Sequence, residues 1–235
     1  MNMNHFGAAA AAALLLSGGQ AFAATIVIDD FNTFQSVTDE PATGSAQQSV
    51  STISTPSAIG GTRTLRAVND EFGATPENAT TLTSGAGELS FSNNDDATGI
   101  GTLTYSGLNL SAQRDSVFNF NEVEFDNGGN LFFSAEAEDS DGTRIRFTEL
   151  LADRFSTSLS FAEFDDGDSL DDFNFASIVE LMFEVDSTGR ATGVDGSIGS
   201  ITLTTDVAPI PLPAAGFLLL GSLGGLAALR RHKKA

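Results

Sequence analysis

The chain has 235 residues, and its 31 acidic side chains against 11 lysines and arginines give a formal net charge of −20. A surface of this charge repels phosphate backbones, which argues against nucleic acid as a partner. Cysteine is absent and the two histidines, His5 and His232, lie near the chain ends, so the region between them has neither thiol chemistry nor an imidazole base.

The first 23 residues are expected to be an export signal. Residues 8–16 form an apolar core, and Ala21 and Ala23 supply the small side chains of a cleavage site after Ala23. The preceding residues contain no lysine or arginine, which departs from the usual pattern. Nine apolar residues are too few to span a bilayer, so a cleaved signal is favoured over an uncleaved anchor.

Residues 24–206 are predicted to form one acidic domain. This region contains all 31 acidic residues and seven arginines but no lysine, a formal charge of −24. Its length suits one domain with its own core. We interpret the charge mainly as a means of solubility at high ionic strength, where repulsion is screened.

Strand-like segments separated by turn residues fill this domain and predict an all-β sandwich, jelly-roll-like in architecture. The clearest hairpin signal is Asp141-Gly142, whereas 38–61 indicates a long loop or a loosely held edge strand. Segment 175–181 fits either a helix or a strand. The predicted strands are 25–28, 63–69, 88–92, 100–106, 116–120, 130–137, 143–150, 159–164, 178–186 and 197–205.

Sixteen of the 19 phenylalanines lie in the domain and are the main candidates for its core. Alternation within the strand 143–150 places Arg144 and Arg146 on the outer face, where they are expected to pair with acids. The phenylalanines expected between two sheets are Phe118, Phe120, Phe125, Phe132, Phe147, Phe161, Phe173, Phe175 and Phe183.

Two acidic clusters are the candidates for ion binding. The denser one surrounds Gly167 and could hold Ca²⁺, although it lacks the spacing and the trailing glutamate of an EF-hand loop, so a solvated turn is the favoured interpretation. Its members are Asp165, Asp166, Asp168, Asp171 and Asp172. The second cluster is interpreted as a charged hairpin tip and comprises Glu136, Glu138, Asp139 and Asp141.

Catalysis is not expected. Paired carboxylates could hydrolyse glycosides, but with 31 acids some pair will stand at a suitable distance by chance. The domain has no tryptophan and a single tyrosine, Tyr105, so aromatic platforms for sugar rings are scarce. No cofactor is expected beyond the candidate Ca²⁺.

Residues 207–235 combine a proline motif, an apolar segment and a basic end. No charged side chain occurs from 209 to 229, and a helix over about 213–229 would be at the lower limit for a bilayer span. The basic cluster that follows predicts a cytoplasmic C-terminus. The proline motif is Ile210, Pro211, Leu212, Pro213 and Ala214, and the basic cluster is Arg230, Arg231, Lys233 and Lys234.

This order of motif, helix and basic cluster resembles the PEP-CTERM class of sorting tails, in particular the variant with the signature Val-Pro-Leu-Pro-Ala, with Ile210 in place of valine. The resemblance covers about 29 of the 235 residues. It implies a membrane-embedded exosortase as partner, passage through the inner membrane, and delivery to the cell surface or extracellular matrix. A plain membrane anchor is the alternative. The start of the domain, a short strand followed by Asp29, Asp30 and Phe31, is also similar to that of many such passengers.

The sequence is therefore consistent with two functions. The first is a non-catalytic structural or adhesive protein of the surface or exopolysaccharide matrix. The second is a β-sandwich module that binds a glycan or Ca²⁺ at the envelope. The ligand itself is not encoded in any motif of the chain.

Overall fold

The computed structural model describes residues 23–39, 48–54, 59–69, 78–94, 96–126, 131–151, 157–189 and 192–205, with the backbone alone for 48–54 and 166. Ala24–Thr205 form one compact unit. The signal core, Ala21, the proline motif, the expected membrane helix and the basic cluster lie outside the described residues. Within the described ranges, no helix has the length and apolar character needed to cross a bilayer.

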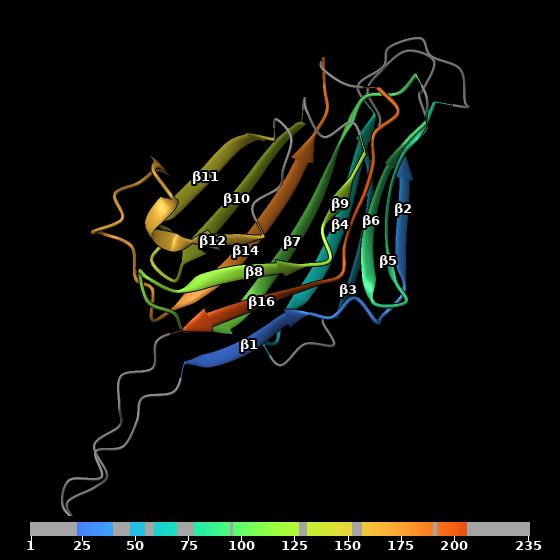
Figure 1. Ribbon diagram of the computed structural model, residues 1–235. Coiled ribbons are helices and arrows are strands. Elements are labelled where there is room, and N and C mark those ends of the chain that lie inside the picture. The colour runs from blue at the N-terminus through green and yellow to red at the C-terminus, as the bar shows by residue number, and fades with distance from the viewer. Residues whose placement is uncertain are drawn as a thin grey trace, which may run out of the picture. The chain divides into compact units, whose positions relative to one another are not determined.

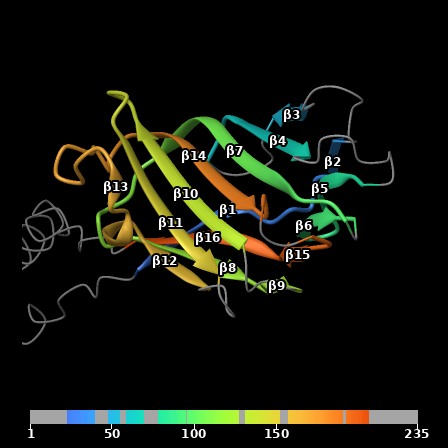
Figure 2. The ribbon, with the colours of Figure 1, turned by 90° about the horizontal axis from the view of Figure 1, so that it is seen from above.

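One layer is a seven-stranded antiparallel sheet with the order β13-β11-β10-β14-β7-β4-β3. Figure 2 shows its strands side by side from β11 to β4. The predicted Asp141-Gly142 turn joins β10 to β11, with Gly142 at φ 85°, and the segment 38–61 contributes edge strand β3. The strands are β3 Gln48–Ser54, β4 Thr62–Asn69, β7 Gly99–Leu110, β10 Leu131–Asp139, β11 Arg144–Leu151, β13 Asp166–Gly167 and β14 Ile178–Asp186.

The second layer consists of two shorter antiparallel sheets. The four-stranded sheet has the order β1-β16-β8-β12, and Figure 1 shows β8 and β16 crossing in front of the seven-stranded sheet. The five-stranded sheet has the order β2-β5-β6-β15-β9. The strands are β1 Ala24–Asp29, β2 Gln35–Asp39, β5 Thr80–Gly85, β6 Glu88–Asn93, β8 Val117–Asn121, β9 Glu124–Phe125, β12 Ser158–Ser160, β15 Asp195–Ile198 and β16 Ser200–Thr205.

These two sheets share bent segments of chain. Short breaks separate β1 from β2, β8 from β9 and β15 from β16, and they contain Phe31 at φ 51°, Glu122 at φ 52° and Gly199. Left-handed backbone at a non-glycine residue costs about 1–2 kcal/mol, so the first two bends need support from their surroundings. Strands β1 and β16 pair directly, whereas hairpin β5–β6 lies between β2 and β15 and splits the layer.

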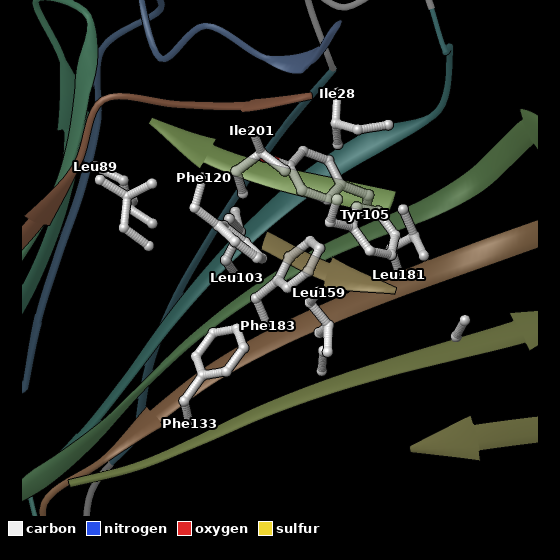
Figure 3. Close-up of a cluster of buried hydrophobic side chains, with 14 of the residues drawn as sticks. Ile28, Leu89, Leu103, Tyr105, Phe120, Phe133, Leu159, Leu181, Phe183 and Ile201 are labelled. Atoms are coloured by element: carbon white, nitrogen blue, oxygen red, sulfur yellow. The ribbon is translucent and has the colours of Figure 1, made fainter. Parts of the chain in front are cut away.

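Phenylalanine fills the space between the layers, as predicted. Phe118 meets Phe161 and Phe183 edge-on at centroid distances of 4.9 and 5.5 Å, and Phe120 meets Phe133 at 5.6 Å. Figure 3 shows Phe120, Phe133 and Phe183 among aliphatic neighbours from both layers. Five of the predicted core rings are buried and three more pack against the core while partly exposed. The buried five are Phe118, Phe120, Phe161, Phe173 and Phe183, and the other three are Phe125, Phe147 and Phe175.

Two details of the prediction were wrong. Phe132 is not in the core, because Leu131 and Phe133 point inward and alternation directs Phe132 to the opposite face. The predicted strand 159–164 ends at Ser160, whose side chain caps a 3₁₀ turn over Phe161–Glu163. Ser160 Oγ accepts a hydrogen bond from Ala162 N, and Glu163 Oε2 accepts one from Ser160 N. This capping box replaces the hydrogen bonds of the strand ladder.

Candidate functional site

The outer face of the seven-stranded sheet gathers most of the described arginines and a set of carboxylates. Alternation turns the apolar residues of each strand inward, and the register aligns the outward residues in rows across five strands. We call this surface the charged face. Its residues are Phe132, Ser134, Glu136 and Glu138 on β10, Arg144, Arg146, Thr148 and Leu150 on β11, Glu180, Met182, Glu184 and Asp186 on β14, Ile100, Thr102, Thr104 and Ser106 on β7, and Thr62, Thr64, Arg66 and Val68 on β4.

Arg144 is bound by two glutamates of the neighbouring strand. Its Nη1 donates to Glu136 Oε1 at 2.9 Å, and its Nη2 pairs with the Glu138 carboxylate. Burial lowers the pKa of Arg144, but the charges of Glu138 and Glu136 outweigh burial and raise it from its ordinary value. The two glutamates position the guanidinium group, and because the Arg144 side chain is 55% exposed, this group remains accessible to a ligand.

The next row continues the network onto β14 and β7. Arg146 Nη2 donates to Ser134 Oγ at 3.2 Å and lies 3.7 Å from a Glu184 oxygen. Two further hydroxyls, on β7, hold β14 carboxylates: Thr102 donates to Glu184 at 3.3 Å and Ser106 donates to Glu180 at 2.9 Å. The sheet therefore presents cationic donors and anionic acceptors at set positions.

One margin of the charged face is mostly apolar, with Asp186 as its single charged residue. The register places Leu150, Phe132, Asp186, Ile100 and Val68 in a single row from β11 to β4. Leu150 is 41% exposed, and Phe132 and Ile100 are half-buried. An apolar row beside fixed polar groups is the usual composition of a site for a ligand that has both kinds of surface.

This arrangement suits the binding of polyhydroxylated ligands. Guanidinium groups donate in pairs and carboxylates accept in pairs, which matches neighbouring hydroxyls of a sugar. The apolar margin can cover the C–H face of a ring. Sequence reasoning had placed Arg144 and Arg146 outward, as the structure confirms, but it missed Phe132, Glu180, Met182 and Glu184. The partial alternation of apolar and polar residues in 180–186 was the signal that could have found the two glutamates, whereas the apolar Phe132 and Met182 have apolar neighbours and no such signal.

The interpretation of Glu136, Glu138, Asp139 and Asp141 as one charged hairpin tip was right only for Asp141, which lies exposed in the β10–β11 turn. Both glutamates lie on the sheet, and Asp139 is buried beneath the turn. Its Oδ1 accepts from Asp141 N and Thr143 N, and its Oδ2 accepts from Asn174 N at 2.8 Å. Burial raises the pKa of Asp139, but the backbone donors together outweigh burial and lower it from its usual value.

The candidate calcium loop lines an open hollow of about 330 Å³ together with Arg114. Asp171 forms an ion pair with Arg114 at 2.8 Å, and Asp168 Oδ2 accepts from Arg144 N at 3.0 Å. Among the side chains that the structure describes, no three acidic residues are gathered as metal ligands would be. The side chain of Asp166 lies outside the described set, and the Ca²⁺ site stays a prediction.

Comparisons with known proteins do not identify a family for this chain. No family model matches the chain, and no curated protein matches it. Among solved structures, it is similar to the family 11 carbohydrate-binding module of the cellulosomal cellulase Lic26A-Cel5E of Clostridium thermocellum, with 14% identity, 80% of this chain and 97% of that chain covered, and a TM-score of 0.40. The xylan-binding module CBM15 has 14% identity, with 78% of this chain and 97% of that chain covered and a TM-score of 0.36. TmCBM61 in complex with β-1,4-galactotriose has 10% identity, with 66% of this chain and 86% of that chain covered and a TM-score of 0.33. At these TM-scores, no function passes from these modules to this chain.

Proposed function

We propose that the protein is an exported, non-catalytic β-sandwich of the cell envelope that binds a polysaccharide through the charged face. The observation that carries this proposal is the in-register network of Arg144, Arg146 and their glutamates on rigid strands. Groups that are already oriented lose little conformational freedom when a ligand binds. Sites built on strands are also held more accurately than sites on loops.

The net charge of the domain limits the class of polysaccharide that it can bind. With a formal charge of −24 between residues 24 and 206, the domain repels strongly anionic polymers at low salt. The face itself mixes both signs, so it suits a polymer rich in hydroxyls that bears little net charge. Binding by hydrogen bonds to charged side chains then provides specificity, and the apolar margin adds contact area.

The binding test compares matched glutamate variants of the full-length protein. Glu136→Gln keeps the size of the side chain but removes the charge that pairs with Arg144, and we expect affinity for the bound polysaccharide to fall about tenfold. Glu149→Gln is the control, because Glu149 lies on β11, the strand that pairs with β10, but alternates to the other side of the sheet. Affinity electrophoresis through gels that contain neutral or weakly charged polysaccharides measures the difference. Equal retardation of the two variants would contradict the assignment of this face.

Delivery to the envelope rests on the C-terminal resemblance. An exosortase-type enzyme acting near Pro211 and Pro213, followed by release to the surface or matrix, is the route that the motif implies. A surface polysaccharide would then be within reach of the charged face. The same protein would serve as a matrix component when the bound polymer is the matrix itself.

Deletion of residues 209–235 tests the route separately. We expect the truncated chain to appear in the medium while the full-length chain is found with the envelope. Fractionation of producing cells with an antibody against the domain measures the distribution. An unchanged distribution would refute sorting by the tail and would leave the binding proposal standing.

A further inference from the structure

A second surface with a different chemistry lies on the five-stranded sheet. Phe34, directly before β2, is 71% exposed, far more than any other aromatic side chain that the structure describes. Its ring lies over Gly85 of the neighbouring strand, where an added Cβ would stand 3.1 Å from Phe34 Cδ2. The register Gln35–Ser84 places Phe34 and Gly85 side by side, on the outward side of this sheet.

The residues on both sides of Phe34 are held from below by one buried arginine. Arg63 Nη2 donates to Thr33 O at 2.7 Å, and its Nε donates to Gln35 Oε1 at 2.9 Å. Ser84 Oγ donates to Thr33 O as well, at 3.1 Å. An exposed aromatic ring on such a fixed segment has little ordering entropy to lose when a ligand covers it.

The surface next to Phe34 consists mainly of hydroxyl groups. Two outward rows run across the sheet in register, and Ser36 and Thr83 hydrogen bond to each other at 2.9 Å, as do Thr38 and Thr81 at 3.1 Å. We call these residues the hydroxyl face. They are Ser36 and Thr38 on β2, Thr81 and Thr83 on β5, Ser90 and Ser92 on β6, and Ser197 on β15.

The charge of this surface indicates the kind of partner. On the described strands of the five-stranded sheet, the outward side carries no arginine or lysine, and its carboxylates, Glu88, Asp195 and Glu124, stand at a turn or near the β9 edge. An anionic polymer would find no counter-charge here, and a cationic one would meet few carboxylates. A neutral partner rich in hydroxyls matches the face best.

We propose that Phe34 and the hydroxyl face form a second binding surface, for an uncharged polysaccharide. Phe34 stacks on the C–H face of one sugar ring, and the serine and threonine hydroxyls exchange hydrogen bonds with the sugars that follow along the chain. The surface is on the opposite layer of the sandwich from the charged face, so this proposal does not depend on the one above. A protein with both surfaces can join two polymers.

The test uses the full-length protein in a zwitterionic detergent, with microcrystalline cellulose and chitin as solid probes. We expect Phe34→Ala to weaken binding to at least one probe by about fivefold or more, as the loss of a stacking contact does. Phe34→Trp restores or strengthens binding. Val27→Ala is the matched control, because Val27 is an exposed apolar side chain, 46% exposed, on a different sheet. Binding in 0.5 M NaCl equals binding in dilute buffer, since no ion pair takes part.

Glu136→Gln separates this proposal from the previous one, because adsorption that is lost in Glu136→Gln but kept in Phe34→Ala would assign these probes to the charged face and overturn the hydroxyl face as their site. The unfolding midpoint of Phe34→Ala in urea should equal that of the unmodified protein, which excludes misfolding as the cause of a loss. The proposal is overturned if the unmodified protein adsorbs to neither probe. It is equally overturned if Phe34→Ala adsorbs as well as Val27→Ala does.

Discussion

Arg144 and Arg63 belong to the same sheet but differ in exposure and in the kind of ion pair that they form. Arg144 points outward from β11, is 55% exposed, and pairs with glutamates that also reach solvent. Arg63 points inward from β4, is fully buried, and pairs with Asp29 at 2.9 Å. Tyr105 also donates to the same Asp29 oxygen, at 2.7 Å. An ion pair at the surface can exchange partners with a ligand, whereas a buried one can only support the chain around it.

The same contrast separates the two candidate surfaces. On the charged face the proposed binding groups are charged, and surface ion pairs and hydroxyls of neighbouring strands hold them. On the hydroxyl face the proposed binding groups are neutral, and the charge lies beneath them, where Arg63 contacts Asp29, Thr33 and Gln35. Exposed pairs are worth about 0–1 kcal/mol, while removal of one partner of a buried pair costs about 3–5 kcal/mol.

The largest effect is therefore expected from Arg63→Met. This change leaves Asp29 as an unpaired buried carboxylate, and we expect the free energy of unfolding to fall by about 3–5 kcal/mol. Urea unfolding followed by circular dichroism measures it. Because Arg63 also holds the residues that flank Phe34, binding to uncharged polysaccharide should fall in the same variant at temperatures where it stays folded.

Arg144→Met is the control for that measurement, with an expected loss of less than about 1 kcal/mol. Similar losses for the two variants would remove the distinction between a surface pair and a buried pair on which the comparison rests. A large loss for Arg144→Met alone would indicate that the charged face is a structural network.

A smaller effect is expected at the two aspartates that end β10 and β2. The pKa of Asp139 is lowered, so its carboxylate stabilises the fold above about pH 3.8, and this contribution is lost as the pH falls through the folded-state pKa. Asp139→Asn should cost about 1–3 kcal/mol at pH 7, because an amide meets the backbone donors of Asp141 and Asn174. The cost should shrink in strong acid.

Asp39→Asn is the matched control with the opposite sign. Burial raises the pKa of Asp39, although Asn69 N, at 2.8 Å, and the charge of Arg66 oppose this. The stabilising contribution of Asp39 to the fold is therefore complete below about pH 3.8, and it is lost as the pH rises through the raised folded-state pKa of Asp39. Asp39→Asn should be at least as stable as the unmodified protein at pH 7. Urea midpoints between pH 3 and pH 8 check both variants, and parallel profiles would contradict the assigned pKa directions.

Local patterns in the chain were sufficient for the central strands of the seven-stranded sheet, but not for its edge strand β13. Alternation in 63–69 and 143–150, the strand-length run 178–186 and the Asp141-Gly142 turn predicted these strands, and the phenylalanine positions predicted most of the core. The pattern was too weak for β2 and β5, which are short, mainly polar segments with one large apolar residue each, Val37 and Leu82. Those strands form the sheet that bears the hydroxyl face.

Long-range pairing decided the rest. Nothing near Arg63 in the chain indicates that Asp29 and Tyr105 meet it in the interior, since these residues lie 34 and 42 positions away and come together only when β1 and β7 pack. Likewise Glu184 joins Arg146 because β14 and β11 flank the same strand, β10. The alternation of side chains along a strand determines which residues share a face, because it follows from the backbone of that one strand. Which faces meet, and what charge they enclose, depends on contacts between distant segments that no local pattern records.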